Sequence, residues 1–362
     1  MKIKNIFFAA ILVLAGFSCS MEDDAIMNDV EKGIEEATEA YTVLDFGVAF
    51  NEMATKASTT VVPGEDRPAT GDENNDEKKI SEVSVFLLED GKVIGILKSQ
   101  NRNQVSSNSD GSITLKDLKF VTKYKTNRTL EAHVVINGNQ FLKNINIGDA
   151  QSALNQQISG CLSADQLIKY GSTRIVFGKD ITNSYPSPSV AENNPTTILV
   201  KVSHVAARLD FSQFDVTLKG FEGNPTVVFD EAKFVNLQQN GKIVEGDASV
   251  NVKDGAFLNR SNRIGTRWTD MGTAYGYANQ YRQDSEMNTA LYVKFTVDGR
   301  TFEKTYPINP AGITKEVDHN GIKGGYLYDI KVRWTITPDW GDSTIEFYTR
   351  DWVHNTIPEV VL

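Results

Sequence analysis

The sequence predicts a mainly β protein, built as two β-sandwich-like domains in series with one or two short helices. Short stretches of alternating apolar and polar residues recur along the chain, and Gly, Asn and Asp turns separate them. Helical periodicity is scarce, which disfavours parallel α/β units. The 362 residues suffice for about two domains. A proline-rich stretch at 183–196 places the expected boundary near Pro195, between domains at 57–195 and 196–362.

Composition and motifs exclude several classes of protein. The net charge of −10 has the wrong sign for phosphate neutralisation, so no nucleic acid is expected among the partners. Cys19 and Cys161 are too few for a disulfide framework or a thiolate zinc site. The acidic run 72–77 lacks the spacing of a calcium loop and indicates a solvated charge run. We therefore predict no metal site and no cofactor.

Enzyme motifs are missing from the sequence. It contains no HExxH, Walker, GxSxG or GxGxxG pattern, so we predict no catalytic residues and a protein that is not an enzyme. The four histidines lie far apart, and a packed role is expected for His133 and His204. A surface hydrolase would require these distant histidines to meet carboxylates in the fold.

Residues 1–19 resemble the signal peptide of a bacterial lipoprotein. Lys2 and Lys4 precede the apolar run 6–17, which as a helix would be about 18 Å long, too short for a hydrocarbon core of ~30 Å. The segment from Gly16 to Cys19 resembles a lipobox, with Gly16 in place of the usual Leu, and implies lipidation of Cys19. An ordinary signal cut beside an incidental cysteine is the alternative. The acidic residues that follow resemble the surface-export signal of Bacteroidetes lipoproteins and imply an outer-membrane precursor that faces outward.

The acidic arm, residues 20–56, contains an isolated strand at 41–50. Apolar and polar residues alternate along this strand, but the polar segments on either side offer no core of their own. The strand must therefore dock into a sheet formed by later residues. Its apolar contributions are Val43, Phe46, Val48 and Phe50.

The later elements follow in order. A hairpin at 80–98 turns at Glu89-Asp90-Gly91. Helical windows are predicted at 149–158 and at 163–170, the second with Ser163 as N-cap. Further strands are predicted at 112–120, 129–137, 173–177, 197–211, 214–218, 226–237, 290–297, 301–308, 326–335 and 344–348.

The segment 260–281 has two interpretations. Its exposed aromatic side chains could stack on sugar rings, or it could fold over the core of the second sandwich, which is the favoured interpretation. The residues concerned are Arg260, Arg263, Arg267, Trp268, Tyr275, Tyr277 and Tyr281. Further along, Asp342-Ser343-Thr344 resembles an O-glycosylation sequon, which marks Ser343 as a possible acceptor.

The order of these features resembles the fimbrillins, or type V pilins, of Bacteroidetes. The resemblance covers nearly the whole chain and rests on the lipobox, the acidic arm with its lone strand, the hairpin around EDG, VKVSHVAARLDF, GGYLYDIKVRWTI and STIEFYTRDW. It implies two transthyretin-like β-sandwich domains. It also implies a fimbrial subunit precursor that supports adhesion and assembles with copies of itself or related subunits. A protease specific for Lys or Arg removes the N-terminal strand, and a neighbour's strand replaces it.

The residues can be compared with that mechanism. Between Cys19 and Lys78 the basic residues are Lys32, Lys56 and Arg67. Arg67 precedes a proline, which hinders cleavage, and a cut at Lys32 would leave the strand attached. Lys56-Ala57 is therefore the predicted cleavage site, and the lipid would anchor the precursor to the outer membrane only until that cut.

The donor strand is predicted at 353–362. Its apolar residues are Val353, Ile357, Val360, Val361 and Leu362. These residues could instead complete the sheet of their own domain, and Pro358 requires an edge or bulge position in either case. The alternative function is a monomeric surface lipoprotein of the same fold that binds glycan or another adhesin component.

Overall fold

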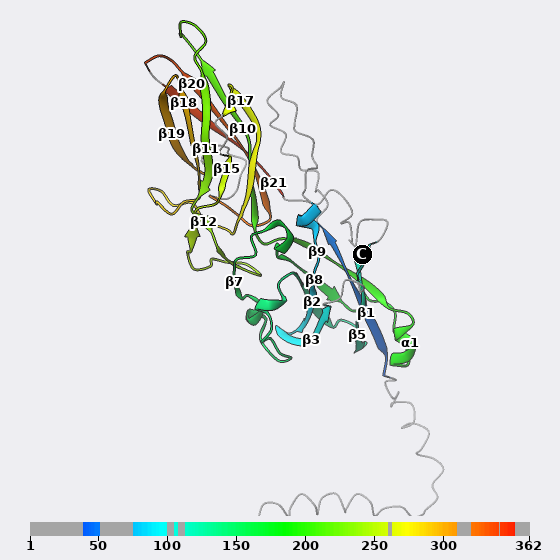
Figure 1. Cartoon of the computed structure of the whole chain (residues 1–362). Coiled ribbons are helices and arrows are strands. Elements are labelled where there is room, and N and C mark those ends of the chain that lie inside the picture. The colour runs from blue at the N-terminus through cyan, green and yellow to red at the C-terminus, as the bar shows by residue number, and fades with distance from the viewer. Residues whose placement is uncertain are drawn as a thin grey trace, which may run out of the picture.

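The computed structural model describes residues 39–50, 75–99, 105–107, 113–259, 263–309, 320–339 and 341–351, and the structural statements below concern these residues. They form a mainly β protein with one short α-helix, as predicted (Figure 1). The elements in chain order are β1 (Tyr41–Phe50), η1 (Asn75–Lys78), β2 (Val83–Glu89), β3 (Lys92–Ser99), β4 (Val105–Ser107), β5 (Ile113–Lys123), β6 (Thr129–Ile136), η3 (Asn139–Phe141), η4 (Gln151–Leu154), β7 (Gln157–Ser159), η5 (Ala164–Gln166), β8 (Lys169–Val176), α1 (Pro188–Glu192), β9 (Thr196–His204), β10 (Ala207–Leu218), β11 (Val227–Val235), β12 (Leu237–Gln238), β13 (Asn240–Lys242), β14 (Val252–Lys253), β15 (Phe257–Asn259), β16 (Arg263–Ile264), β17 (Arg267–Gly276), β18 (Ala290–Val297), β19 (Arg300–Pro307), β20 (Tyr326–Ile336) and β21 (Gly341–Asp351).

The first domain is one folded-over sheet of order β3-β2-β6-β8-β9-β1-β5-β4. Strands β8 and β9 pair only where Lys169 and Tyr170 meet His204 and Ser203, so the sheet turns a corner there. Gly171 permits this corner, because a Cβ at that position would lie 1.8 Å from the carbonyl oxygen of Lys201. The halves β3-β2-β6-β8 and β9-β1-β5-β4 enclose one apolar core, to which both contribute side chains.

The second domain is a sandwich of two sheets, β17-β10-β20-β21 and β15-β11-β18-β19. Aromatic side chains fill the space between them. The ring of Phe214 lies 5.4 Å from that of Phe229 and 5.2 Å from that of Phe295, and Phe295 lies 5.1 Å from Trp334. Such edge-on contacts add to the free energy gained from burying the rings.

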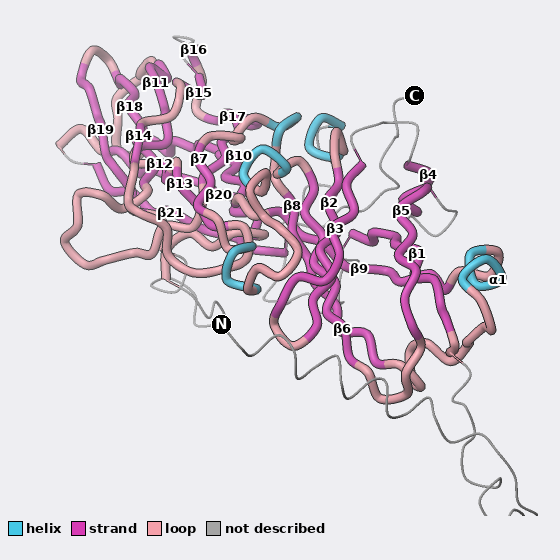
Figure 2. The backbone as a smooth tube through the Cα atoms, turned by 90° about the horizontal axis from the view of Figure 1, so that it is seen from below, coloured by secondary structure: helices cyan, strands magenta, loops and turns pink. Residues whose placement is uncertain are grey.

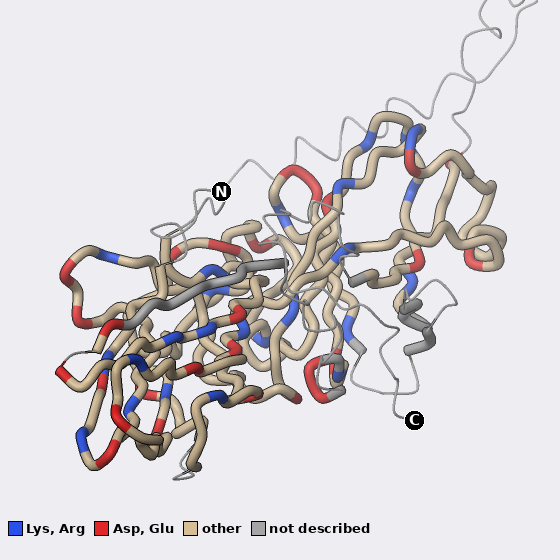
Figure 3. The backbone as a smooth tube through the Cα atoms, turned by 90° about the horizontal axis from the view of Figure 1, so that it is seen from above, with Lys and Arg blue, Asp and Glu red and all other residues tan. Residues whose placement is uncertain are grey.

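A third apolar cluster joins the two domains. It brings Phe86 and Val135 of the first domain together with Ile243, Tyr277 and Leu327 of the second. Strand β7 also pairs with β13 in a small antiparallel sheet across the same region. The domains therefore meet through packed side chains and paired backbone. Basic and acidic residues are interspersed over both of them (Figure 3).

The predicted helical windows contain only short 3₁₀ helices. The window 149–158 contains the 3₁₀ helix η4 and strand β7, and the window 163–170 contains η5 and the start of β8. Ser163 makes no side-chain cap. Pairing of β7 with the distant strand β13 overrides the local helical pattern. The α-helix lies instead in the proline-rich stretch, where the hydroxyl of Ser187 accepts a hydrogen bond from the backbone N–H of Val190.

The change of sheet falls later than the expected boundary near Pro195. Strand β9 pairs with β1 and β8 of the first domain, whereas β10 belongs to the second. The predicted strand 197–211 is thus two strands in different sheets, separated by Val205 and Ala206. Within the described residues no helix has the length and apolarity needed to span a membrane.

Candidate functional site

Strand β1 lies in the interior of its half-sheet, between β5 and β9 (Figure 2). It runs antiparallel to β5 and parallel to β9. Leu44 stands opposite Phe120 of β5 and Thr196 of β9. Because β1 pairs on both edges, its removal would leave an open slot between two strands whose backbone groups had lost their partners.

The side chains of β1 are buried on both faces of the half-sheet. Leu44, Phe46 and Val48 enter the core of the first domain and are 0% exposed. Val43, also 0% exposed, lies on the opposite face. Helix α1 packs against β1 and β5. The alternation that identified Phe46 and Val48 also holds for Leu44, which the sequence analysis left out.

Burial of this strand involves a large free energy. Four apolar side chains at roughly 1.5–3 kcal/mol each give about 6–12 kcal/mol before conformational entropy is subtracted. A whole domain is stable by about 5–15 kcal/mol. β1 should therefore stay bound after a cut in the chain beyond it, unless another strand takes its place.

Backbone hydrogen bonds fix the start of β1. The N–H groups of Tyr41 and Tyr185 each donate to the other's carbonyl oxygen at 2.8 Å. The carbonyl of Ala40 accepts from the N–H of Tyr124 at 2.7 Å. Lys123 donates to Glu39 and thereby lowers the pKa of that carboxyl, but the pair is exposed and contributes little to stability. These backbone bonds hold the start of β1 beside Tyr124 and Tyr185.

The pairing of β1 with β5 is interrupted once. The register breaks between Asp45 and Gly47, so Phe46 has no registered partner in β5. On the other side Phe46 stays in register opposite Ile198 of β9. The slot is therefore continuous along β9 and irregular along β5.

The far end of β1 reaches the joint between the domains. Phe50 stands opposite Val202, close to the end of β9. The described chain resumes at η1, and there Glu77 is 0% exposed. Nη1 of Arg208, at the start of β10, donates to Oε2 of Glu77 at 3.0 Å. The end of β1 and the 3₁₀ helix η1 thus both lie near the connection between β9 and β10.

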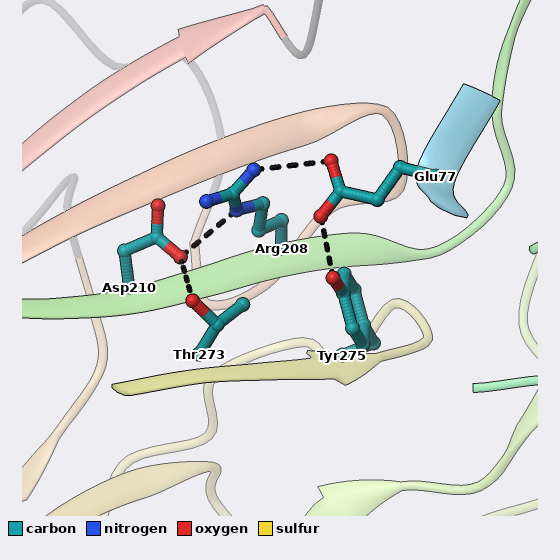
Figure 4. A network of polar contacts seen from close by, with 5 residues as sticks. All are labelled: Glu77, Arg208, Asp210, Thr273 and Tyr275. Atoms are coloured by element: carbon teal, nitrogen blue, oxygen red, sulfur yellow. Dashed lines mark hydrogen bonds and ion pairs between the residues drawn. The ribbon is translucent and has the colours of Figure 1, made fainter. Parts of the chain in front are cut away.

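Glu77 belongs to a polar network with the second domain (Figure 4). The hydroxyl of Tyr275 donates to Oε1 of Glu77, and Nε of Arg208 donates to Oδ1 of Asp210 at 2.9 Å. Thr273 donates to the same Asp210 oxygen at 2.8 Å. Burial and the Glu77 carboxylate raise the pKa of Tyr275, which keeps its hydroxyl protonated as a donor. Burial alone would lower the pKa of Arg208. The negative charges of Asp210 and Glu77 outweigh this effect, so the pKa is raised.

This network corrects the interpretation of the run 72–77 as a solvated charge run. Glu77 faces the protein interior, while the side chain of Asp76 remains half exposed in an ion pair with Lys79. Nothing in the local sequence distinguishes the two carboxylates. Arg208 and Tyr275 become neighbours of Glu77 only through the fold, so sequence reasoning missed them.

The aromatic residues considered for sugar stacking are largely occupied within the fold. Trp268 lies in the core of the second domain, 5.3 Å from the ring of Phe214. Tyr277 is buried in the joint, where its hydroxyl donates to the carbonyl of Gly160 at 2.6 Å. Tyr275 is partly buried against the cluster that joins the domains, and its hydroxyl binds Glu77. Arg260 lies outside the described residues.

Of the four histidines, His133 and His204 lie in the described part of the chain. His133 is buried, its Nδ1 lies 2.7 Å from the hydroxyl of Tyr170, its Nε2 lies 3.4 Å from Oε2 of Glu131, and burial lowers its pKa. His204 is also buried. The described residues contain no group of three His, Cys, Asp or Glu side chains placed to hold a metal ion.

Several residues predicted as sites lie outside the described residues. They are Cys19, Lys56, Ala57, Val353, Ile357, Val360, Val361 and Leu362. The backbone of Ser343 lies in β21, opposite Trp334, and that of Phe50 completes β1.

Comparisons with known proteins show the fold. No protein-family model and no curated protein matches the sequence. A structure of a proposed cell-adhesion protein from Parabacteroides distasonis matches with a TM-score of 0.57 and 18% identity, covering 87% of this chain and 98% of that one. A fimbrilin (FimA) from Porphyromonas gingivalis matches with a TM-score of 0.49 and 14% identity, over 87% and 99% of the two chains. The tip fimbrial protein Mfa3 of the same organism gives 0.46 and 12%, over 86% and 100%. The matches to these Bacteroidetes fimbrial and adhesion proteins span nearly the full length of this chain, and the first shows a shared fold.

Proposed function

We propose that this protein is the lipoprotein precursor of a structural subunit of a cell-surface fimbria, and that β1 is its removable strand. One observation carries the proposal. β1 comes from the arm that precedes the predicted cleavage site, yet it is an interior strand with four buried apolar side chains. Every other strand of its sheet begins at or after Val83. The first domain is thus completed by a segment that one cut would detach.

The proposed pathway has three steps. Lipidation of Cys19 delivers the precursor to the outer membrane and then to the cell surface. A protease specific for Lys or Arg cuts between Lys56 and Ala57, after which only non-covalent contacts hold β1. A strand from another copy or a related subunit then occupies the slot between β5 and β9, and the donor is the segment 353–362.

The mode of binding follows from the slot. Backbone hydrogen bonds to β5 and β9 would supply affinity for any extended strand, and the core-facing positions of Leu44, Phe46 and Val48 would supply selectivity. Because β1 fills these positions well, replacement should be slow and hard to reverse. Filaments built in this way should resist heat.

The test is a pair of lysine substitutions. Lys56→Ala precursor should fold, stay monomeric and keep the arm, whereas Lys32→Ala, the matched control, should be processed and assemble as the natural chain does. Mass spectrometry of the mature N-terminus and gel ladders of high mass report the two outcomes. Normal filaments of Lys56→Ala protein with residues 41–50 still attached would refute the cleavage switch.

The alternative, a monomeric surface lipoprotein that binds glycan, gains no support from the fold. The rings of Trp268, Tyr275 and Tyr277 are engaged within the protein. A monomeric binder would stay attached to the membrane through Cys19. The subunit should instead be released from its lipid and found in filaments, and Cys19→Ala should reduce its surface display.

A further inference from the structure

We propose that Arg128 braces β5 against the other half of the first domain. β5 is one wall of the β1 slot, and the brace keeps the slot in shape when β1 leaves it. The inference rests on the proposed function, in which another strand must enter that slot. It makes Arg128 a positioning residue, which acts on the strand in the slot through β5.

β5 depends on β1 for its place in the sheet. Within the described residues, β5 pairs only with β1 and with the three-residue strand β4, whereas β9, the other wall, also pairs with β8. Once β1 has left, no backbone ladder joins β5 and β4 to the rest of this sheet. The carbonyl of Ala40, which accepts from the N–H of Tyr124, leaves with β1. Contacts other than strand pairing must therefore hold β5.

Arg128 links the two halves of the domain. It lies between β5 and β6, and its side chain is 16% exposed. Nε and Nη2 donate to the two carboxylate oxygens of Glu89, at the end of β2, at 2.7 and 2.8 Å. Nη1 donates to the hydroxyl of Thr122 at 2.6 Å and to the carbonyl oxygen of Lys123 at 2.9 Å, both in β5. These four hydrogen bonds are the brace, and they join one strand of each half.

The guanidinium of Arg128 suits this role. A planar fork that meets both oxygens of a carboxylate fixes direction as well as distance. The hydrogen bonds from Arg128 lower the pKa of the Glu89 carboxyl, so the carboxylate stays charged at neutral pH. The guanidinium also lies over the ring of Phe177, 5.5 Å from its centroid, and Phe177 is fully buried in the core of the first domain. The brace is thus fixed beside a core residue.

A second contact between the halves lies earlier in β5. The ring of Phe120 packs on Gly95 of β3, where a Cβ would lie 2.6 Å from Cε2 of that ring. Leu118 adds a buried side chain to the same core. These apolar contacts hold the middle of β5, but hydrophobic packing has no preferred direction. The directional bonds of Arg128 therefore determine where the end of β5 lies.

The brace makes its bonds outside β1. Its partners lie in β2 and β5, so the release of β1 breaks none of these four hydrogen bonds. Without the brace, β5 would swing about residues 124–128 once β1 had left. Only those molecules with β5 in place could then take up a strand. Loss of the brace should therefore slow the return of a strand to the slot without speeding the departure of β1.

Thiol labelling of the uncut chain separates these two rates. Cys19 and Cys161 are replaced by serine, and Val48→Cys places one thiol on β1 at a core-facing position that is fully buried. At low reagent concentration the labelling rate follows the opening equilibrium of β1. At saturating concentration it equals the rate at which β1 opens.

Two variants remove the brace in different ways. Arg128→Lys retains the positive charge but loses the fork, and Glu89→Gln removes the negative charge but keeps one acceptor oxygen. Arg300→Lys is the matched control, because this arginine also lies over an aromatic ring, that of Phe302 in the second domain. Circular dichroism shows whether each chain folds, and Glu89→Gln, the milder change, decides the test if Arg128→Lys does not.

We expect both brace variants to raise the labelling rate at low reagent concentration roughly ten- to hundredfold, because hydrogen bonds between charged groups are lost. The rate at saturating reagent should equal that of the parent chain, and Arg300→Lys should change neither rate. An equal rise of both rates would show that Arg128 holds β1 itself, and no change in either would show that β5 needs no brace. Each of these results overturns the proposal and leaves the removable strand intact. Filaments of Lys56→Ala protein that retain residues 41–50 would instead overturn the proposed function.

Discussion

Phe46→Ala should loosen β1 in its slot more than any other single truncation in the strand. The side chain is 0% exposed and packs in the core of the first domain, between the two halves of the folded-over sheet. Truncating a buried phenylalanine to alanine costs about 3–5 kcal/mol, because the transfer free energy is lost and a cavity remains. Once the chain is cut, this free energy weakens the binding of β1 to its slot. The dissociation constant of the strand should therefore rise by roughly two to three and a half powers of ten.

The assay follows the cut arm. The chain is cut experimentally between Phe50 and Asn75 and passed through gel filtration, and mass spectrometry measures the fraction of the 41–50 segment that remains with the body. Ile264→Ala is the matched control, an apolar truncation at a side chain that is 75% exposed in the second domain. Circular dichroism of the uncut chains shows whether both variants fold. Equal retention of the strand by Phe46→Ala and natural protein would refute the view that β1 is held by its buried side chains.

Three further predictions concern the joint between the domains and the buried His133. Glu77→Ala should lower the free energy of unfolding in urea by about 3–5 kcal/mol, because it removes one partner of the buried ion pair with Arg208; a loss near zero would mean that water reaches this network. Tyr277→Phe deletes the 2.6 Å hydrogen bond to the carbonyl of Gly160 and should cost about 0.5–1.5 kcal/mol in the same titration, with an unchanged value contradicting the bond. Burial lowers the pKa of His133 below its ordinary value of 6.5, so the unfolded chain binds this proton more readily than the folded chain. The stability that neutral His133 contributes is present above pH 6.5 and is lost as the pH falls through the lowered pKa. His133→Gln should therefore flatten the plot of unfolding free energy against pH in this range. An equal slope in the variant and the natural protein would contradict the prediction.

Local alternation was enough to predict the strands that matter for the proposed function. Strand β1 has the predicted bounds, and the hairpin of β2 and β3 turns at Asp90 and Gly91, both with positive φ. These features depend on neighbours in sequence, since a half-buried strand must alternate and a tight turn must carry residues that tolerate a left-handed backbone. The β fold was predicted for the same reason.

Apart from α1, which begins at a local Ser187 cap, the features that sequence reasoning missed depend on contacts between distant residues. Glu77 is buried because Arg208 and Tyr275 reach it from the second domain. Residues 157–159 form a strand because β13 pairs with them, although their own pattern favours a helix. Trp268 is a core residue because β17 pairs with β10. In each case the partner is too far along the chain for any local pattern to indicate.

The joint determines what a cut between Phe50 and Glu77 can do. Phe50 stands beside Val202 near the end of β9, and Glu77 binds Arg208 near the start of β10, the strand that follows β9 in the chain. A covalent link of this kind holds a strand at an effective concentration on the order of millimolar, however dilute the protein. One cleaved peptide bond ends that advantage and leaves every contact in the slot unchanged. If the proposed function holds, β1 would from then on compete with other strands by mass action, and the local concentration of those strands would decide which one the slot contains.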